Sequence, residues 1–163
     1  MISIDLTGKT ALVTGSGQGL GKATATRLHK AGAQVAVNYF PDPEGVNKAR
    51  AEETVSELGE RAVAVGGDVR DRSSISAMFE KVAERFDAID IVINNAAVLR
   101  DRSIKKMDHS DWDAVIQTNL TGVYNVCKEA ATRLADGGRI VSMASISGFV
   151  GFFGQANYSA AKA

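Results

Sequence analysis

Short apolar runs alternate with longer amphipathic stretches along most of the chain. Such runs, without polar interruption, are typical of strands buried on both faces of a parallel sheet. The stretches between them favour helices, because their apolar residues recur every three or four positions. The predicted strands span residues 10–14, 34–38, 61–65, 89–93 and 139–143.

Two of the predicted helices are long and clearly amphipathic. One covers residues 75–86, and the other starts at Asp111 and continues as one unbroken helix to Leu134. Shorter helices are expected over residues 22–30, ending at Gly32, and within residues 41–60. The longest predicted apolar stripe comprises Trp112, Val115, Ile116, Leu120, Val123, Cys127, Ala130, Ala131 and Leu134.

Strands that alternate with helices imply an α/β fold with a parallel sheet and right-handed crossovers. With 163 residues, of which 45% are hydrophobic and 23% charged, the chain suits a single domain over residues 1–163. Ligands in such sheets bind beyond the carboxyl ends of the strands. Polar groups that follow predicted strands should therefore meet at one edge, and these are the glycines after Thr14, Asp68, Asn95 and Ser145.

Charge and composition exclude several classes of function. A net charge of zero gives no electrostatic footprint for nucleic acid or for an anionic membrane surface. No apolar run approaches the roughly 18 residues of a membrane span, and an acid stands where a signal peptide is apolar, so a cytoplasmic location is expected. Cys127 is the only cysteine, which excludes an internal disulfide, and we expect it to be buried. His29 and His109 lack partners for a metal site, so no metal is expected and both are assigned to the surface.

A glycine-rich turn between the first predicted strand and helix carries the first chemical signal. It reads Gly15-Ser16-Gly17-Gln18-Gly19-Leu20-Gly21. Glycines let the backbone approach a pyrophosphate closely, and the free N–H groups of a helix start attract its negative charge. The strict Gly-x-Gly-x-x-Gly pattern is not met, since Leu20 or Lys22 stands where its last glycine belongs, and a turn without a ligand is the alternative. Its place between strand and helix favours dinucleotide binding.

The end of the second predicted strand bears on the choice of nucleotide. Dinucleotide-binding folds carry an acid there, about 20 residues after the glycines, which holds the adenosine ribose 2′-hydroxyl. Here the chain has Asn38, Tyr39 and Phe40, and Asp42 follows only after Pro41. No carboxylate repels a 2′-phosphate, and no arginine stands ready to bind one. We therefore favour NADP, with NAD as the alternative, and count Asn38 among the candidate cofactor contacts.

Other polar positions have both a functional and a structural interpretation. Asp68, followed by Val69, could accept a hydrogen bond from an adenine amino group or could be a turn residue. Asn95 could border a cofactor, although asparagine pairs are also ordinary turn formers. Asn119 falls on the apolar side of the long helix, where a buried amide needs partners. Those partners are either backbone groups, in a structural role, or a functional water.

The last predicted element carries Tyr158 and Lys162 four positions apart on an alanine-rich background that favours a helix. Residues i and i+4 share a helix face, so the ammonium can lie beside the phenol. A nearby cation lowers the pKa of a phenol and makes it usable in proton transfer near neutral pH. Ser145 stands 13 residues upstream, at a predicted strand end, with a hydroxyl free to hold a substrate oxygen. The pair alone is a weak signal, because tyrosine and lysine often share exposed helix faces.

In order and spacing, these positions resemble the short-chain dehydrogenase/reductase family over essentially the whole chain. The resemblance implies a Rossmann-type doubly wound parallel sheet with helices on both faces, and hydride transfer to or from a nicotinamide. It also implies that Tyr158 is the general acid or base, that Lys162 binds the nicotinamide ribose, and that Ser145 orients the carbonyl. Asn119 would hold a water that passes protons. The matching set is Thr14-Gly15-x-x-x-Gly19-x-Gly21, Asp68-Val69, Asn94-Asn95-Ala96, Asn119, Ser145 and Tyr158-x-x-x-Lys162.

Within the family, segments 35–39, 99–102, 111–112 and 153–162 look most like 3-oxoacyl-thioester reductases. Those enzymes act on acyl-carrier-protein or coenzyme A substrates and usually use NADPH. A dehydrogenase of another secondary alcohol, such as a sugar or a hydroxysteroid, is the alternative enzyme. The departures are Gln18, where NADPH-using members often carry arginine, Ala97 in place of a common glycine, and Asp136, where a basic residue would better suit an acidic carrier protein.

Family members continue past the point at which this sequence stops, so the sheet is expected to be incomplete at its C-terminal side. Lys162 would then lie in a fraying last turn, and weak or absent catalysis is expected of these residues alone. A catalytically inactive nucleotide-binding module is therefore a third interpretation. Members commonly form dimers or tetramers through the helices that carry Asn119 and Tyr158, which predicts a homo-oligomer.

Overall fold

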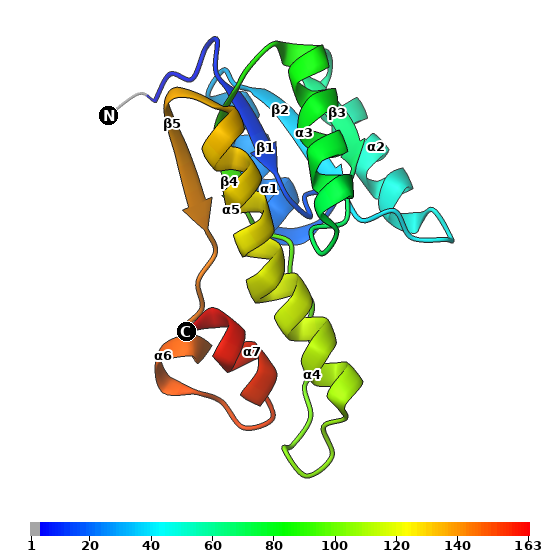
Figure 1. The fold of residues 1–163 in the computed structure, drawn as a ribbon. Helices are drawn as coiled ribbons and strands as arrows, with labels where there is room; N and C mark the ends of the chain where they lie inside the picture. Colours follow the sequence, from blue (N-terminus) through cyan, green and yellow to red (C-terminus); the bar gives the residue numbers. More distant parts are fainter. Residues whose placement is uncertain (1–3) are drawn as a thin grey trace.

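The computed structural model describes residues 4–163 and shows five parallel strands in one sheet with helices on both faces (Figure 1). The strands lie side by side in the order β3-β2-β1-β4-β5. The chain therefore starts in the middle of the sheet, moves outward to β3, and returns past β1 to β4 and β5. The strands are β1 (Thr10–Val13), β2 (Gln34–Tyr39), β3 (Ala62–Gly66), β4 (Ile89–Asn94) and β5 (Leu134–Ser142).

The direction of winding reverses between β1 and β4, which are hydrogen-bonded neighbours. The connection that leaves β1 passes over one face of the sheet and the one that leaves β4 passes over the other, so a crevice opens at their carboxyl ends. This arrangement confirms the expected Rossmann-type doubly wound sheet and places any ligand at that crevice.

The central strands contribute to two apolar cores, because successive side chains of a strand point to opposite faces. Leu12 and Val92 pack on one face with α3 and α5, and Val13 and Ile93 pack on the other with α1 and α2. All four side chains are buried. Burial on both faces explains why these strands are unbroken apolar runs in the sequence. The covering helices are α1 (Gly19–Lys30), α2 (Val46–Leu58), α3 (Arg72–Phe86) and α5 (Gly122–Arg133).

The long helix predicted over residues 111–134 is interrupted, which corrects the sequence-based prediction. α4 (His109–Ile116) and α5 are joined by a π turn, η1 (Gln117–Thr121), that is closed by the N–H of Gly122. A π turn holds one more residue than an α turn and shifts the phase of everything after it. The predicted stripe therefore does not face the core along its whole length, and Trp112 and Leu120 are exposed.

Several element boundaries also differ from the prediction, those of α1 and β5 among them. α1 begins at Gly19 rather than at residue 22, so the end of the glycine-rich turn already belongs to the helix. β5 begins at Leu134 rather than at residue 139, because Leu134 pairs with Ile89 of β4 across a register shift.

The two histidines and the cysteine differ in exposure. His109 is exposed, as expected, whereas His29 is half-buried, and its Nε2 has no hydrogen-bond partner among the described residues. Burial, and to a smaller extent the charge of Arg61, lowers the pKa of His29. Cys127 is half-buried, and its Sγ accepts a hydrogen bond from Asn94 Nδ2 at 3.3 Å.

After β5 the chain adds two short helices, α6 (Ser147–Val150) and α7 (Ala156–Lys162). They lie beyond the carboxyl ends of the strands and pack against each other, and α7 also packs against α4 (Figure 1). Several large apolar side chains are exposed here, among them Phe149 and Phe153. Within residues 4–163, the outer edge of β5 pairs with no further strand. No helix in this range combines the length and apolar character that crossing a bilayer requires.

Candidate active site

The hydroxyl of Thr14 joins the ends of the two strands that flank the crevice. It accepts hydrogen bonds from the N–H groups of Asn95 and Ala96, both at 3.0 Å, and donates to the carbonyl of Ile93 at 3.3 Å. The side-chain amide of Asn95 donates in turn to the carbonyls of Thr14 and Gly15, at 2.9 and 3.0 Å. The glycine-rich turn is therefore fixed to the end of β4 by side chains as well as by the sheet.

Three glycines of the turn are required by their surroundings. A Cβ at Gly21 would lie 2.5 Å from both Asn95 Nδ2 and the carbonyl oxygen of Gly15. Gly15 itself has φ of +61°, and a Cβ there would lie 2.9 Å from the Cα of Ala96. At Gly17 a Cβ would press on the backbone of α2. Gly21 thus allows the close packing of helix against strand that the strict pattern assigns to its last glycine.

Asn38, at the end of β2, holds the turn from the other side. Its Oδ1 accepts from the N–H of Gly15 at 3.0 Å, and its Nδ2 donates to the carbonyls of Val65 and Gly67 at 3.3 and 3.1 Å. The side chain is buried, with 1% of its residue surface exposed. Since both ends of the amide are occupied by backbone groups, the side chain of Asn38 positions the glycine-rich turn.

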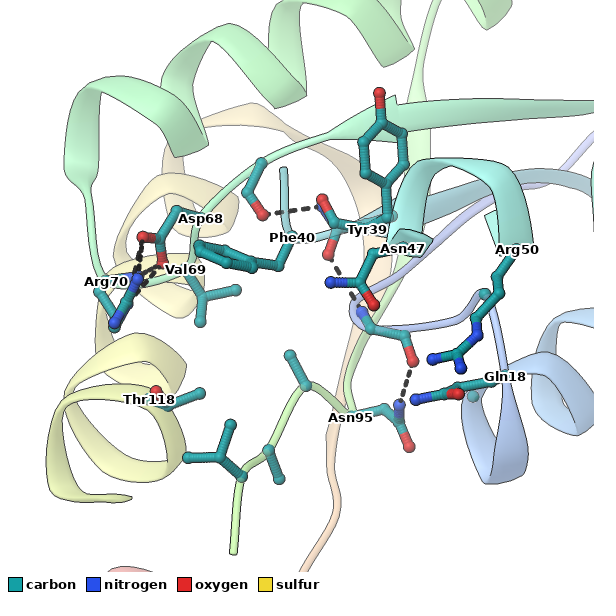
Figure 2. A pocket seen from close by; sticks show the side chains of 18 of the residues that line it. Gln18, Tyr39, Phe40, Asn47, Arg50, Asp68, Val69, Arg70, Asn95 and Thr118 are labelled. Carbon is teal, nitrogen blue, oxygen red and sulfur yellow. Dashed lines mark hydrogen bonds and ion pairs between the residues drawn. The ribbon is translucent and has the colours of Figure 1, made fainter. Parts of the chain in front are cut away.

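A cavity of about 530 Å³ opens at this edge of the sheet, in front of the glycine-rich turn (Figure 2). It brings together every predicted cofactor contact except Gly19, Tyr158 and Lys162. No group of three or more His, Cys, Asp and Glu side chains among residues 4–163 is placed to hold a metal ion. The predicted cofactor contacts that line the cavity are Gly15, Gly17, Gln18, Leu20, Gly21, Asn38, Asp68, Val69 and Asn95.

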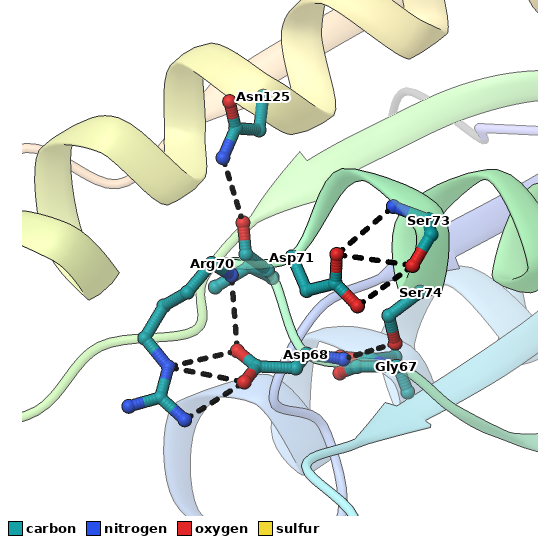
Figure 3. Close-up of polar contacts among 9 residues, drawn as sticks. Gly67, Asp68, Arg70, Asp71, Ser73, Ser74 and Asn125 are labelled. Atoms are coloured by element: carbon teal, nitrogen blue, oxygen red, sulfur yellow. Dashed lines mark hydrogen bonds and ion pairs between the residues drawn. The ribbon is translucent and has the colours of Figure 1, made fainter.

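Asp68 and Arg70 form an ion pair on one wall of the cavity (Figures 2 and 3). Arg70 Nη2 lies 2.7 Å from Asp68 Oδ2, and its Nε and backbone N–H reach Oδ1, each at 2.9 Å. Burial raises the pKa of Asp68, but the hydrogen bonds and the charge of Arg70 outweigh it and leave the pKa below its usual value. The guanidinium of Arg70 also lies over the ring of Phe40, 5.1 Å from its centroid. The guanidinium of Arg70 and the ring of Phe40 together offer a flat surface to a planar base.

The backbone beside this pair is held by contacts from two helices (Figure 3). The N–H of Asp68 donates to Ser74 Oγ at 2.9 Å, and the carbonyl of Val69 accepts from Asn125 Nδ2 at 3.2 Å. Asp71 caps the start of α3 by accepting from the N–H of Ser73. Asp68 is thus both a turn residue and a cavity residue, so the two sequence interpretations are compatible.

Among the cavity residues that the sequence did not indicate, two lie on α2. Asn47 and Arg50 line the cavity, with Arg50 beside Gln18 (Figure 2). The end of β2 itself carries no arginine, but Arg50 lines the same cavity from α2. Arg50 comes 12 residues after Asn38 in the chain, and helix α2 brings it back to the strand end. Arg50 could have been found from which side of α2 faces the sheet. Because α2 is weakly amphipathic, that side is hard to predict from the sequence.

Asn119 lies in the π turn and is buried. Its Oδ1 accepts from the N–H of Val98 at 2.8 Å, and its Nδ2 donates to the carbonyl of the same residue at 2.9 Å. The amide thereby pairs with the chain after β4 as a neighbouring strand would. Of the two interpretations left open by the sequence, this geometry supports the structural one.

Tyr158 and Lys162 share one side of α7, where the Lys162 ammonium lies 5.9 Å from the centroid of the Tyr158 ring. Lys162 Nζ also donates to the carbonyl of Met143 at 2.5 Å, which holds the helix against the chain that leaves β5. Burial lowers the pKa of Lys162. The predicted proximity of amine and phenol is thus present in the structure.

Ser145 lies on the segment between Met143 and α6 and is half-buried. Its Oγ accepts from the N–H of Ser147 at 3.2 Å, and the hydroxyl of Ser147 lies 2.7 Å from that of Ser159 on α7. Ser145 and the tyrosine helix are therefore tied to each other through Ser147. Ser145, Tyr158 and Lys162 do not line the 530 Å³ cavity, whose walls reach only to Val98, Arg100, Ala114 and Thr118.

Gln155 and Asn157, which precede Tyr158 in the chain, attach α7 to a distant loop. Asn157 is fully buried, and its Nδ2 donates to the carbonyls of Arg100 and Asp111 at 3.0 and 3.1 Å. Gln155 Nε2 donates to Asp101 Oδ2 at 2.9 Å. The charged loop that carries Arg100 and Asp101 therefore supports the tyrosine helix.

Comparison with known proteins decides the family. Residues 9–163 match the family described as short chain dehydrogenase. The chain belongs to that family. A 3-oxoacyl-[acyl-carrier-protein] reductase from Synechocystis is 40% identical over 161 residues, which is 97% of this chain and 64% of that protein. An acetoacetyl-CoA reductase from Cupriavidus necator is 41% identical over 163 residues, with 97% and 64% covered. The chain thus spans just under two thirds of the length of these short chain dehydrogenase relatives.

Solved structures of the family have the same fold. A short chain dehydrogenase from Burkholderia cenocepacia, solved in complex with NADP, superposes with a TM-score of 0.87 at 37% identity, covering 96% of this chain and 64% of that one. A dehydrogenase/reductase from Sinorhizobium meliloti gives 0.89 at 35% identity, covering 98% and 63%. The resemblance of motif order and spacing is therefore confirmed as membership of the short chain dehydrogenase family.

Proposed function

We propose that this protein transfers a hydride between NADP(H) and the carbonyl or alcohol carbon of a 3-oxoacyl or 3-hydroxyacyl thioester. The observation that carries the proposal is the hydrogen bond from Lys162 to Met143. Met143 directly follows β5 and stands two residues before Ser145. The bond therefore holds the helix that carries Tyr158 and Lys162 at the end of β5. The similarity to the Synechocystis and Cupriavidus reductases supports the thioester as substrate.

The cavity fits a dinucleotide. No side chain caps the start of α1 and no acid lies in its first turn, so the N–H groups there are available to a pyrophosphate. Gly17 and Gly21 let the turn pack closely on α2 and on the end of β4, which fixes its backbone at the edge of the cavity. In this proposal the turn holds the pyrophosphate, while Asp68 and Val69 border the adenine. The Burkholderia relative was solved with NADP, which supports that form of the nucleotide.

The reacting groups are those at the end of β5 and on α7. The nicotinamide, when bound, supplies or accepts the hydride. Tyr158 gives its phenolic proton to the carbonyl oxygen in reduction and takes it back in oxidation, while Ser145 holds the same oxygen. The ammonium of Lys162 favours the phenolate and so assists the proton transfer. A positioned acid of this kind contributes about 10²–10⁴-fold to the rate.

The test is an assay of NADPH absorbance with acetoacetyl-CoA. Tyr158→Phe should lower the rate at least about 100-fold while leaving NADPH binding unchanged, because the phenol acts in the chemical step. Tyr124→Phe, at an exposed tyrosine of α5, is the matched control and should keep the full rate. The proposal is contradicted if Tyr158→Phe reduces acetoacetyl-CoA as fast as the unaltered protein. A protein that oxidises sugars or hydroxysteroids and ignores thioesters would contradict the substrate alone.

A nucleotide-binding module without turnover is the second candidate. The observation in its favour is that the cavity walls include neither Ser145 nor Tyr158. Calorimetry that shows nucleotide binding, together with an assay that shows no turnover of any carbonyl substrate, would select this candidate.

Self-association is the remaining part of the proposal. It is supported by large apolar side chains that α4, the π turn and α5 leave exposed, which a second copy could cover. These are Trp112, Leu120 and Tyr124.

A further inference from the structure

We propose that Arg50 binds the 2′-phosphate of NADP(H) and so sets the preference of this protein for NADP(H) over NAD(H), with Gln18 and Asn47 as neutral partners. The inference rests on the proposed nucleotide site and names the residue that discriminates within it. It is independent of Tyr158 and of the chemical step.

The position of Arg50 is fixed relative to the glycine-rich turn. A Cβ at Gly17 would lie 3.4 Å from the carbonyl carbon of Arg50 and 3.1 Å from the nitrogen of Ala51. The hydroxyl of Thr54 lies 3.3 Å from the carbonyl oxygen of Gly17 and 2.9 Å from that of Arg50. Helix α2 therefore packs directly on the turn, and any movement of Arg50 away from it would break these contacts.

From this anchor the side chain of Arg50 extends into the cavity beside Gln18, near Asn47 (Figure 2). This part of the cavity lies between the glycine-rich turn and the end of β2. In dinucleotide-binding folds the adenosine ribose lies between these two elements, and an arginine there accommodates a 2′-phosphate. The place of Arg50 thus matches the place where NAD and NADP differ.

The charge of Arg50 is available to a ligand. Within residues 4–163 its guanidinium makes no ion pair and no side-chain hydrogen bond, and the residue is exposed. By contrast, the guanidinium of Arg70 is held by Asp68, and that of Arg100 donates to the carbonyl of Leu99. A planar guanidinium with open donors suits a phosphate, which it can bind through two parallel hydrogen bonds.

Within residues 4–163, the only carboxylate that lines the cavity is Asp68, which is paired with Arg70, so no free carboxylate opposes a phosphate beside Arg50. The strand end carries Asn38, Tyr39 and Phe40 in place of an acid. Asp42 faces the start of α2, where it accepts from the N–H groups of Val46 and Asn47 at 2.8 and 2.9 Å. Desolvation raises the pKa of Asp42, yet these hydrogen bonds lower it on balance. Asp42 is thereby engaged with the helix and does not line the cavity.

The test compares nucleotides that differ only by the 2′-phosphate. Isothermal titration calorimetry would measure the Kd of NADPH and NADH, and of 2′,5′-ADP and 5′-AMP, for the unaltered chain and for Arg50→Ala. Arg50→Ala should weaken NADPH and 2′,5′-ADP about 10- to 100-fold, as expected for a charge-assisted bidentate contact, and leave NADH and 5′-AMP within about twofold. Arg50→Glu should reverse the preference in favour of NADH, because a carboxylate repels the phosphate.

Lys48→Ala is the matched control, because it removes the same charge from the same helix at an exposed residue that does not line the cavity. It should change no Kd. Equal weakening of NADPH and NADH by Arg50→Ala would overturn the assignment, as would an unchanged Kd for 2′,5′-ADP. If the unaltered chain binds none of the four nucleotides, the proposed function itself fails. The two failures are thus distinguished in one series of titrations.

Discussion

The cavity and the tyrosine helix are built in different ways, although both lie at the carboxyl edge of one sheet. The cavity is fixed from within: Thr14, Asn38 and Asn95 are side chains of strand ends, and each bonds backbone groups of a neighbouring strand. The tyrosine helix α7 is attached from outside, through Lys162 to the chain after β5 and through Asn157 to a loop after β4.

The two regions also differ in how far the apolar side chains around them are buried. The strand ends that form the cavity lie above two buried cores, whereas the chain from β5 to α7 leaves many large apolar side chains exposed. The comparison teaches that the geometry of the cavity follows from the sheet itself, while the placement of Tyr158 depends on a small number of polar contacts. The exposed side chains of the second region are Ile140, Val141, Ile146, Phe149, Val150, Phe152 and Phe153.

The largest effect is expected where the cavity region is closest packed. Gly21→Ala should lower the free energy of unfolding by about 2–3 kcal/mol and abolish nucleotide binding, because the new Cβ collides with Asn95 and Gly15. Denaturant unfolding and calorimetry would measure both. Gly59→Ala is the comparison for backbone strain alone: its φ of +86° is unfavourable for alanine, but a Cβ there meets nothing within 4 Å, whereas Gly21 is helical and its Cβ would collide. Gly59→Ala should therefore keep nucleotide binding, and a Gly21→Ala variant that also keeps it would show that packing at Gly21 is unimportant.

A smaller and local effect is expected at the tyrosine helix. Asn157→Ala leaves the carbonyls of Arg100 and Asp111 without their donor, which should cost about 1–3 kcal/mol. Hydrogen exchange should accelerate in residues 98–111 and 156–162 and stay unchanged in β1 and β4. Gln155→Ala, whose partner Asp101 is exposed, should have a weaker effect. Faster exchange throughout the sheet would contradict the separation of the two regions.

The smallest effect is expected at the amino ends of the strands, away from the cavity. There Lys9 Nζ and the N–H of Thr10 donate hydrogen bonds to Asp90 at 2.8 and 2.9 Å. Burial raises the pKa of Asp90, but these hydrogen bonds and the charge of Lys9 leave it below its usual value. A carboxyl with a lowered folded-state pKa stabilises the fold above its unfolded pKa of about 3.9 and loses that contribution as the pH falls through the folded value.

Asp90→Asn should therefore reduce stability at pH 7 by about 1–2 kcal/mol and flatten the decline of stability below about pH 4. Unfolding midpoints measured between pH 7 and pH 3 would check this. Nucleotide affinity should stay unchanged, because Asp90 is remote from the cavity. A change in affinity would show that the two edges of the sheet are coupled.

Much of the fold could be predicted from the sequence because its signals are local. Buried strands are apolar runs, and the glycine-rich turn stands out because it lies between one such run and a helical stretch, although its glycines pack on Ala96, Asn95 and α2. Arg50 could not be predicted, because its place depends on how α2 packs on the turn. The amide of Asn38 was assigned to the cofactor, but its hydrogen bonds join three strands whose register is set by the whole sheet.

The tyrosine helix shows the same limit. The spacing of Tyr158 and Lys162 predicted their proximity, because residues four positions apart share one helix face. Nothing in that spacing indicates Met143 as the partner of Lys162, or Arg100 as a partner of Asn157, since both contacts depend on where α7 docks. The break in the long helix was missed for a related reason: a π turn leaves no distinct pattern of apolar residues.

That π turn has a consequence for how the protein tolerates changes in length. Asn119 within it binds Val98, and Asn125 after it binds Val69, so one residue count sets contacts on two walls of the cavity. Deleting a single residue from 117–121 would rotate α5 by about 100° relative to α4 and detach both asparagines together. Insertions and deletions are ordinarily absorbed by loops. Here a change of one residue inside a helix would alter the nucleotide site as severely as a substitution in its lining.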